Sequence, residues 1–257
     1  MTARSKAKET LAFCLGILLI GGLVQAAGWM KNDRLVFPDV PDILRAFFGL
    51  LSQAETYRKI WITLRHLLEA MALSTLIGVA VGLMEGVWDF ARRLLAPLMI
   101  FLRSIPMIVM VVVVMVLTKY ERVPLLVSSL FLIPLISEAA CEGFRSIEPD
   151  LIDVYRMNSG FNLRVLCGVH LPLMAGYLKQ AYISAVGMGL KLVVSAEYLV
   201  QTRDSLGKAI YSSSYFNEYQ DIYAYALVMI LLVLLISEAP GWIGRGAKRL
   251  SAGRENR

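Results

Sequence analysis

Residues 123–143 read VPLLVSSLFLIPLISEAACEG, and within this run only Glu138 and Glu142 carry a charge. A helix of about 20 predominantly apolar residues spans the roughly 30 Å of hydrocarbon in a lipid bilayer. The run has this length and composition. It therefore predicts a transmembrane helix.

Five further apolar runs have a length that suits a span. They lie at about residues 11–30, 60–84, 94–118, 172–200 and 222–243. The chain has 257 residues, of which 57% are apolar and only 18% charged, and its mean hydropathy is +0.61. This composition is too apolar for an ordinary soluble domain. We expect an all-α, polytopic bundle of six transmembrane helices that forms one domain, residues 1–257.

The basic residues, which give a net charge of +6, lie mainly in short segments beside the apolar runs. A nucleic-acid-binding protein would gather them into one stripe, so we interpret them as topology signals instead. Those closest to span ends are Arg92, Arg93, Arg245, Lys248 and Arg249. Because such residues favour the cytoplasmic side, both termini are predicted to be cytoplasmic.

The cysteines and the N-terminal run exclude some other features. Cys14, Cys141 and Cys167 lie far apart, and the chain has only two histidines, so neither a disulfide framework nor a metal site is expected. The first apolar run is too long for a signal peptide and lacks a small-residue cleavage site. It is predicted to be an uncleaved first span.

A long polar insertion, residues 145–171, separates two of the apolar runs. Its pattern predicts a helix, a break and a second short helix. The features of this pattern are Pro149 at the first helical position, Asp150 and Asp153 near the N-terminal end, Leu151, Val154 and Tyr155 on one apolar face, and Ser159-Gly160 as the break. An amphipathic helix outside the membrane commonly inserts into a groove of another protein. Packing on the spans of its own chain is an equal alternative.

Charged residues also occur within or at the ends of the predicted spans. They are Glu69, Arg103, Glu138, Glu142, Lys179, Lys191, Glu197 and Glu238. An ion in hydrocarbon costs at least about 2.5–3.5 kcal/mol unless it is paired or hydrated, so these side chains should face the bundle, a dimer interface or a cavity. Lys191 either attracts an anionic substrate or pairs with Glu138 or another neighbour. Lys179 is interpreted as a side chain that extends to the membrane surface.

Glycines and prolines indicate how two of the spans are built. Gly78, Gly82 and Gly86 recur at four-residue spacing and so share one helix face, which favours close helix packing within the subunit. Pro97 and Pro106 remove backbone donors from the run 94–118. That run is therefore predicted to contain a hinge or a kink.

The sequence GFRSIEPDLIDV, residues 143–154, continuing through Ser159-Gly160 to Leu171-Pro172, resembles the coupling loop of binding-protein-dependent importer permeases. The most similar branch carries nitrate, sulfonate, taurine and thiamine precursors. The other matching pieces, in order, are Thr63-Leu64, the three glycines, Arg103 to Pro106, Ala196-Glu197 and Ser205-Leu206-Gly207. The resemblance covers about residues 38–243. It departs from the usual family pattern at His66, Asp153, Tyr155, Ser159 and Ser205.

This resemblance implies a permease subunit of a type I ATP-binding-cassette (ABC) importer in the bacterial inner membrane. Two permeases, as a homodimer or a heterodimer, would bind two ATPase subunits and receive a small anionic or zwitterionic solute from an extracytoplasmic solute-binding protein. The coupling residues would be those of the insertion, with the contact made by the helix 149–158. The translocation path or gate would involve Arg103, Pro106, Lys191, Glu197, Leu206 and Gly207. The chain has no GxxxxGK[ST] motif, so ATP and Mg²⁺ are expected on the partner ATPase, and no enzyme activity or cofactor is expected here.

Two other classes of protein share some of these features. A proton-coupled secondary transporter could use intramembrane carboxylates such as Glu138 and Glu197, but it would not need the insertion 145–171. An intramembrane hydrolase is disfavoured, because no nucleophile-elbow motif is present and the two histidines fall on opposite sides of the predicted membrane.

Overall fold

The computed structural model describes residues 38–146 and 170–236, together with the isolated positions Gly16, Gly22, Gln25, Val36 and Gly168, and only the backbone of residue 173. The described segments are helices with short connections, and no strand occurs among them. The predicted all-helical architecture is confirmed for these residues. Most of the predicted first span, 11–30, and most of the insertion 145–171 lie outside them.

The described residues fall into two compact units. The first comprises those of Met1–Arg58 and Ala209–Leu231, and the second those of Lys59–Lys208 and Leu232–Arg257. The first unit contains helix α2 (Val40–Ser52), which begins with a proline in its first turn and buries Ile43 and Leu50. A proline suits this position because the first backbone N–H groups of a helix have no acceptor within it.

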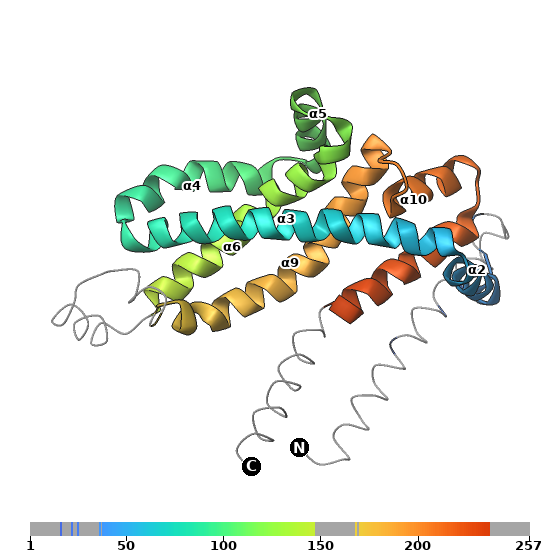
Figure 1. Ribbon diagram of the computed structural model, residues 1–257, viewed down its shortest axis with the longest axis horizontal. Coiled ribbons are helices and arrows are strands. Elements are labelled where there is room, and N and C mark those ends of the chain that lie inside the picture. The colour runs from blue at the N-terminus through green and yellow to red at the C-terminus, as the bar shows by residue number, and fades with distance from the viewer. Residues whose placement is uncertain are drawn as a thin grey trace, which may run out of the picture. The chain divides into compact units, whose positions relative to one another are not determined.

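The second unit holds most of the helices that concern us. They are α3 (Ala54–Val87), whose first turn lies in the first unit, α4 (Asp89–Ser104), α5 (Met107–Leu117), the 3₁₀ turn η1 (Tyr120–Arg122), α6 (Val123–Arg145), α9 (Leu171–Val200) and the start of α10 (Leu206–Tyr215). A further helix, Tyr219–Ile236, ends in this unit. Within the unit α6 packs against α9, and Figure 1 shows the two running side by side.

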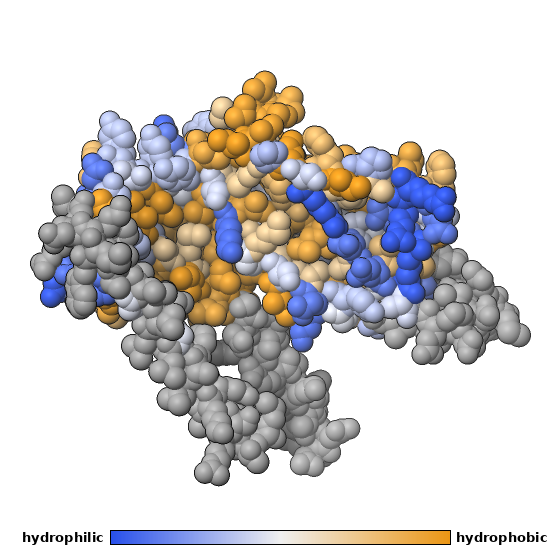
Figure 2. Space-filling view, turned by 180° about the vertical axis from the view of Figure 1, so that it is seen from behind, coloured by the Kyte–Doolittle hydropathy of each residue, from blue (hydrophilic) through white to orange (hydrophobic). Residues whose placement is uncertain are grey.

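Four helical segments of the described chain are long and apolar enough to cross a membrane, and a bent pair of helices adds a fifth candidate. The four are Ala54–Val87, Tyr120–Arg145, Met174–Val200 and Tyr219–Ile236. Large hydrophobic side chains such as Leu76 and Val116 are exposed, at 73% and 80% of their surface. Figure 2 shows that hydrophobic residues cover much of one face of the molecule, as expected where lipid replaces water as the solvent. The chain is a multi-pass membrane protein.

The predicted span 94–118 is two helices rather than one. Helices α4 and α5 meet at 104°, and Ile105 between them has an extended backbone conformation. Pro106 explains the break, because a proline disfavours helical geometry in the residue before it and donates no hydrogen bond itself. Figure 1 shows α5 turning sharply away from α4. Pro97, by contrast, lies within α4 without ending it.

The predicted glycine face of α3 packs directly on α6. A Cβ added at Gly78 would lie 3.0 Å from the carbonyl oxygen of Ile133, and one at Gly82 would overlap the backbone of α6 at Ser137. A Cβ at Gly86 would meet the ring of Phe144. The prediction of close helix packing within the subunit is therefore confirmed, and no side chain larger than hydrogen fits at Gly82.

Contacts at the helix ends define two ends of the second unit. At one end, Thr63 near the start of α3 reaches Glu197 near the finish of α9. At the other, Gly86 of α3 meets Phe144 of α6, whose ring lies 4.6 Å from that of His170 just before α9. The insertion therefore leaves and re-enters the bundle at this second end.

Candidate functional site

Glu197 of α9 is a fully buried carboxylate that is held by three donors. Its Oε2 accepts hydrogen bonds from the Thr63 hydroxyl at 2.8 Å and from the Gly207 backbone N–H at 3.2 Å. Its Oε1 lies 2.7 Å from Nδ1 of His66. An unsatisfied carboxylate in this position would be strongly destabilising, and these partners replace the water that it loses.

The partners of Glu197 also complete the start of α10. The Leu206 N–H donates to the Thr63 hydroxyl oxygen at 3.0 Å, and the Lys208 N–H donates to Ser205 Oγ at 3.2 Å. The first N–H groups of a helix have no acceptor within it and carry partial positive charge. Side chains from α3 and α9 thus satisfy the first turn of α10 and place a carboxylate where the helix dipole favours it.

Gly207 has no space for a side chain. A Cβ at this position would lie 2.5 Å from both the Tyr198 nitrogen and the Val194 carbonyl oxygen, and it would overlap the side chain of Glu197. The first turn of α10 therefore approaches the α9 backbone as closely as backbones can. We call the group Thr63, His66, Glu197, Ser205, Leu206 and Gly207 the Glu197 junction.

The structure brings together three of the six residues predicted for the translocation path, namely Glu197, Leu206 and Gly207. Sequence analysis did not assign Thr63 or His66 to this group. Their spacing on α3 was the available signal, because polar residues three apart in a helix share a face. The sequence could not identify their partner, Glu197, because it lies more than 130 positions away along the chain.

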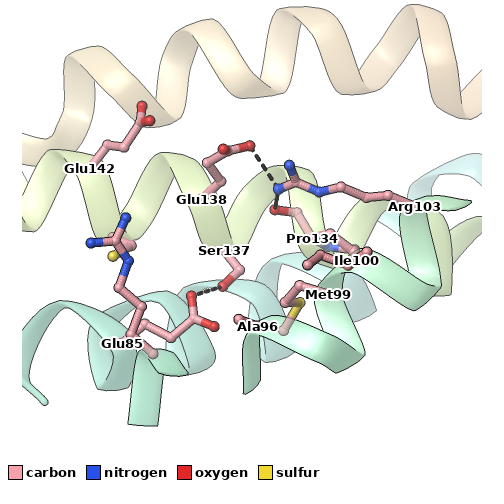
Figure 3. A pocket seen from close by; sticks show the side chains of 11 residues that line it. Glu85, Ala96, Met99, Ile100, Arg103, Pro134, Ser137, Glu138 and Glu142 are labelled. Carbon is pink, nitrogen blue, oxygen red and sulfur yellow. Dashed lines mark hydrogen bonds and ion pairs between the residues drawn. The ribbon is translucent and has the colours of Figure 1, made fainter. Parts of the chain in front are cut away.

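Arg103 lies apart from the Glu197 junction, beside a cavity of about 210 Å³ between α4 and α6. Its guanidinium donates to Glu138 Oε2 at 2.7 Å and to the Pro134 carbonyl oxygen at 2.9 Å. Figure 3 shows this pair at one side of the cavity, with Glu85 receiving a hydrogen bond from Ser137 nearby. Both members of the ion pair are about half exposed.

Lys191 does not pair with Glu138, which was one of the two alternatives for it. Arg103 forms the ion pair with Glu138 instead. Lys191 is exposed on α9, and within the described part of the chain it forms no hydrogen bond or ion pair. Pro106, the remaining path candidate, ends the break between α4 and α5, where Ile105 and Met107 pack on a hydrophobic cluster that includes Ala196.

The predicted coupling residues lie outside the described part of the chain. They are Pro149, Asp150, Leu151, Asp153, Val154, Tyr155, Ser159 and Gly160. Glu238 lies outside it as well. Among the described residues, no group of three or more histidine, cysteine, aspartate or glutamate side chains could hold a metal ion.

Residues 74–244, about two thirds of the chain, match the family model of the binding-protein-dependent transport system inner membrane component. The chain belongs to this family. The matched range includes α6, α9 and the residues of the Glu197 junction from Glu197 onward, whereas Thr63 and His66 precede it. This family consists of transport permeases rather than enzymes.

Individual relatives of this permease agree with the family match. A probable ABC transporter permease protein of Brucella melitensis is 23% identical over 227 residues, which are 86% of this chain and 92% of that protein. The bicarbonate transport system permease protein CmpB of Synechococcus elongatus is 24% identical over 186 residues, 71% of this chain and 66% of that one.

A solved structure supports the fold of the permease. The inward-facing MetNI methionine ABC transporter matches with a TM-score of 0.62 and 22% identity, over 74% of this chain and 94% of the matched chain. At this identity the likeness concerns the fold alone. Together with the family match, it makes the protein a permease subunit of an ABC importer.

Proposed function

We propose that this permease subunit, paired with a second permease, forms the path for a small anionic or zwitterionic solute across the bacterial inner membrane. Two ATPase subunits would drive the transport, and an extracytoplasmic solute-binding protein would deliver the solute. The observation that carries the proposal is the Glu197 junction, which fastens α3, α9 and α10 to one another by hydrogen bonds to one buried carboxylate. In this proposal the parts of α3 and α9 around the junction move together with the first turn of α10.

The proposed coupling segment follows α6 and precedes α9, so it joins α9 at the end opposite Glu197. Residues 147–167 begin after α6 and end before α9, and these two helices pack on each other within the second unit. A force that an ATPase applies to the helix 149–158 would therefore act on α6 and α9 together. Rigid-body movement of packed helices is a common basis for alternating access in transport proteins.

The proposed solute class draws on the resemblance to permeases for nitrate, sulfonate and taurine. The similarity to a bicarbonate transport permease points in the same direction, because bicarbonate is also a small oxyanion. In this proposal Lys191 contributes positive charge to the path, and Arg103 lines it as an ion pair with Glu138. Pro106 sets the bend beside the path, and the Glu197 junction with Leu206 and Gly207 supports the gate.

The test is affinity purification of the subunit from its native membrane in mild detergent, followed by mass spectrometry and an ATPase assay. We expect a nucleotide-binding subunit to co-purify and to show vanadate-sensitive hydrolysis that the solute-binding protein stimulates. Isolation of the chain alone and without ATPase activity would overturn the proposal and would direct attention to proton-driven transport.

A further inference from the structure

A second, larger cavity of about 620 Å³ lies in the second unit, next to the Glu197 junction. Its wall comes from the third to fifth turns of α3, the segment around η1, the start of α6 and the loop that follows α9. This volume falls within the range of roughly 300–1,000 Å³ that is typical of small-molecule sites. The cavity shares only His66 with the junction, and none of its residues was assigned to the translocation path.

The charged lining of this cavity has an excess of guanidinium groups. Three arginines, Arg65, Arg122 and Arg203, face two carboxylates, Glu69 and Glu121. Arg65 and Glu69 form an ion pair at 2.7 Å and so neutralise each other. Within the described residues, the side chains of Arg122 and Arg203 form no hydrogen bond or ion pair. Two guanidiniums therefore remain against the single carboxylate of Glu121.

Thr202 supplies an independent indication of a polar ligand. This cavity residue is only 4% exposed, yet its hydroxyl has no hydrogen-bond partner among the described residues. A buried hydroxyl without a partner is unfavourable by about 1–3 kcal/mol, so a buried hydroxyl normally has one. The hydroxyl oxygen has almost no exposed surface, so the Thr202 side chain would have to rotate about χ1 for a ligand in the cavity to become that partner.

The loop that carries Thr202 and Arg203 is held in a defined shape. Gln201 and Asp204, on either side of this pair, have left-handed backbone conformations with φ of 52° and 55°. The Thr202 N–H donates to the Glu197 carbonyl oxygen, and the Thr202 carbonyl oxygen accepts from the Ser205 hydroxyl. These contacts fix the two residues at the cavity without the help of a ligand, which lowers the entropic cost of binding one.

We infer that this cavity binds the oxyanion group of a small solute through Arg122, Arg203 and the Thr202 hydroxyl. Guanidinium groups are the preferred partners of carboxylate, sulfonate and phosphate oxygens, because their N–H groups form charge-assisted and often bidentate hydrogen bonds. The inference deepens the proposed function and rests on it for the direction of transport, which makes this cavity the outer entrance. Binding itself can be measured without transport.

The experiment uses the purified full-length chain in a maltoside detergent, which contains no phosphate. Phenylglyoxal modifies accessible arginines, and peptide mass spectrometry gives the modification rate of each one. We expect sodium sulfate or sodium acetate, at ten times its dissociation constant, to slow modification of Arg122 and Arg203 by about tenfold. Sodium chloride at equal ionic strength should not do so. Arg45, which lies on α2 and pairs with Asp42, serves as the internal control.

Two variants test whether the guanidiniums act together. Arg203→Gln should abolish the protection of Arg122, whereas Lys119→Gln, a change at a neighbouring exposed residue outside the cavity wall, should leave it intact. Thr202→Val should raise the sulfate or acetate concentration that gives half protection by about tenfold, which is the loss of one hydrogen bond to a charged group.

The inference is overturned if neither anion protects Arg122 and Arg203 in the unmodified chain, or if chloride protects equally. Protection only in phosphatidylglycerol nanodiscs would also overturn it, since the anion would then be a lipid headgroup. Protection of both arginines in a chain that co-purifies with no ATPase would keep the site and refute the proposed function. An active ATPase complex without protection would do the reverse.

Discussion

The hydroxyl of Thr63 and the carboxylate of Glu197 lie 2.8 Å apart in the interior of the permease, and the same hydroxyl oxygen accepts a hydrogen bond from the Leu206 N–H. One side chain on α3 thus connects to both α9 and α10. Thr63→Val keeps the shape of the side chain and removes both bonds. We expect it to leave the buried Leu206 N–H without a partner and to remove one of the three hydrogen bonds of Glu197, which keeps Gly207 and His66. Stability should fall by about 1–3 kcal/mol.

The matched control for this change is Thr56→Val on the same helix. Thr56 is also fully buried, but its hydroxyl has no partner among the described residues. Its replacement should therefore be neutral or slightly stabilising. Thermal unfolding of the detergent-solubilised chain measures both variants, and equal melting temperatures for the two would contradict the role given to Thr63.

Gly207→Ala should destabilise the permease, because the added methyl group collides with the α9 backbone at Val194 and Tyr198. Overpacking of this kind costs about 1–3 kcal/mol, and more where backbone must move. Gly176→Ala on α9, where a Cβ meets nothing within 4 Å, should be neutral or stabilising by up to about 1 kcal/mol. Size-exclusion chromatography and unfolding temperature separate the two outcomes, and a fully stable Gly207→Ala variant would refute the close approach.

Removing Arg103 should impair the permease through the carboxylate that it leaves behind. Arg103→Gln deprives Glu138 of its ion-pair partner, whereas the double variant Arg103→Gln with Glu138→Gln removes both charges. If the pair is mainly a device for neutralising charge in the membrane, the double variant should have the higher uptake. Uptake in reconstituted vesicles decides this. Lower uptake in the double variant than in the single one would instead assign Glu138 a direct role in transport.

Lys191→Ala should weaken the uptake of anions specifically, because this exposed ammonium is proposed to add positive charge to the path. Lys179→Ala, on the same helix, is the control and should have little effect. We expect a rise in KM for anionic solutes and no change for neutral analogues. An equal loss for both kinds of solute would mean that Lys191 acts through structure.

Replacing residues 150–155 with a glycine-serine sequence should abolish co-purification of the ATPase, since it removes the helix proposed to enter the groove of that subunit. Asp153→Glu, which introduces the residue more usual in the family, should preserve binding. Quantitative mass spectrometry of the purified complex gives the ratio of the two subunits. An unchanged ratio in the glycine-serine variant would show that the ATPase docks elsewhere.

Local patterns predicted much of this fold. The apolar runs, the glycine face of α3 and the disruptive effect of Pro106 each depend on residues within a few turns of one another. The structure confirms the glycine face, the break at Pro106 and four of the six runs as long apolar helices. The run 94–118 is a bent pair of helices, and most of the run 11–30 lies outside the described residues. The bend of 104° was not predicted, because a proline fixes only its own and the preceding residue, while the packing of α5 on α6 and α9 sets the angle. The count of six spans and the cytoplasmic termini stay predictions.

The candidate site, too, could be predicted only in part: residues that stand out locally were found, whereas their distant partners were not. Glu197 could be selected from sequence because a charge in an apolar run is unusual, and Gly207 because Ser205-Leu206-Gly207 resembles a motif of the family. Thr63 could not be connected to them, and the partner of Glu138 was sought on the wrong helix, since Arg103 approaches it only after α4 folds back along α6. Long-range pairings of this kind depend on tertiary packing and leave no local signal.

Along the contact between α3 and α6, three glycines at four-residue spacing bring the α3 backbone directly against α6, with no α3 side chain between the two helices at these positions. The α3–α6 contact therefore has one favourable arrangement, and sliding one helix along the other would not reach a second one. We therefore expect α3 and α6 to move together during transport, and we expect the change of shape to occur where the chain already bends, at Ile105 and Pro106.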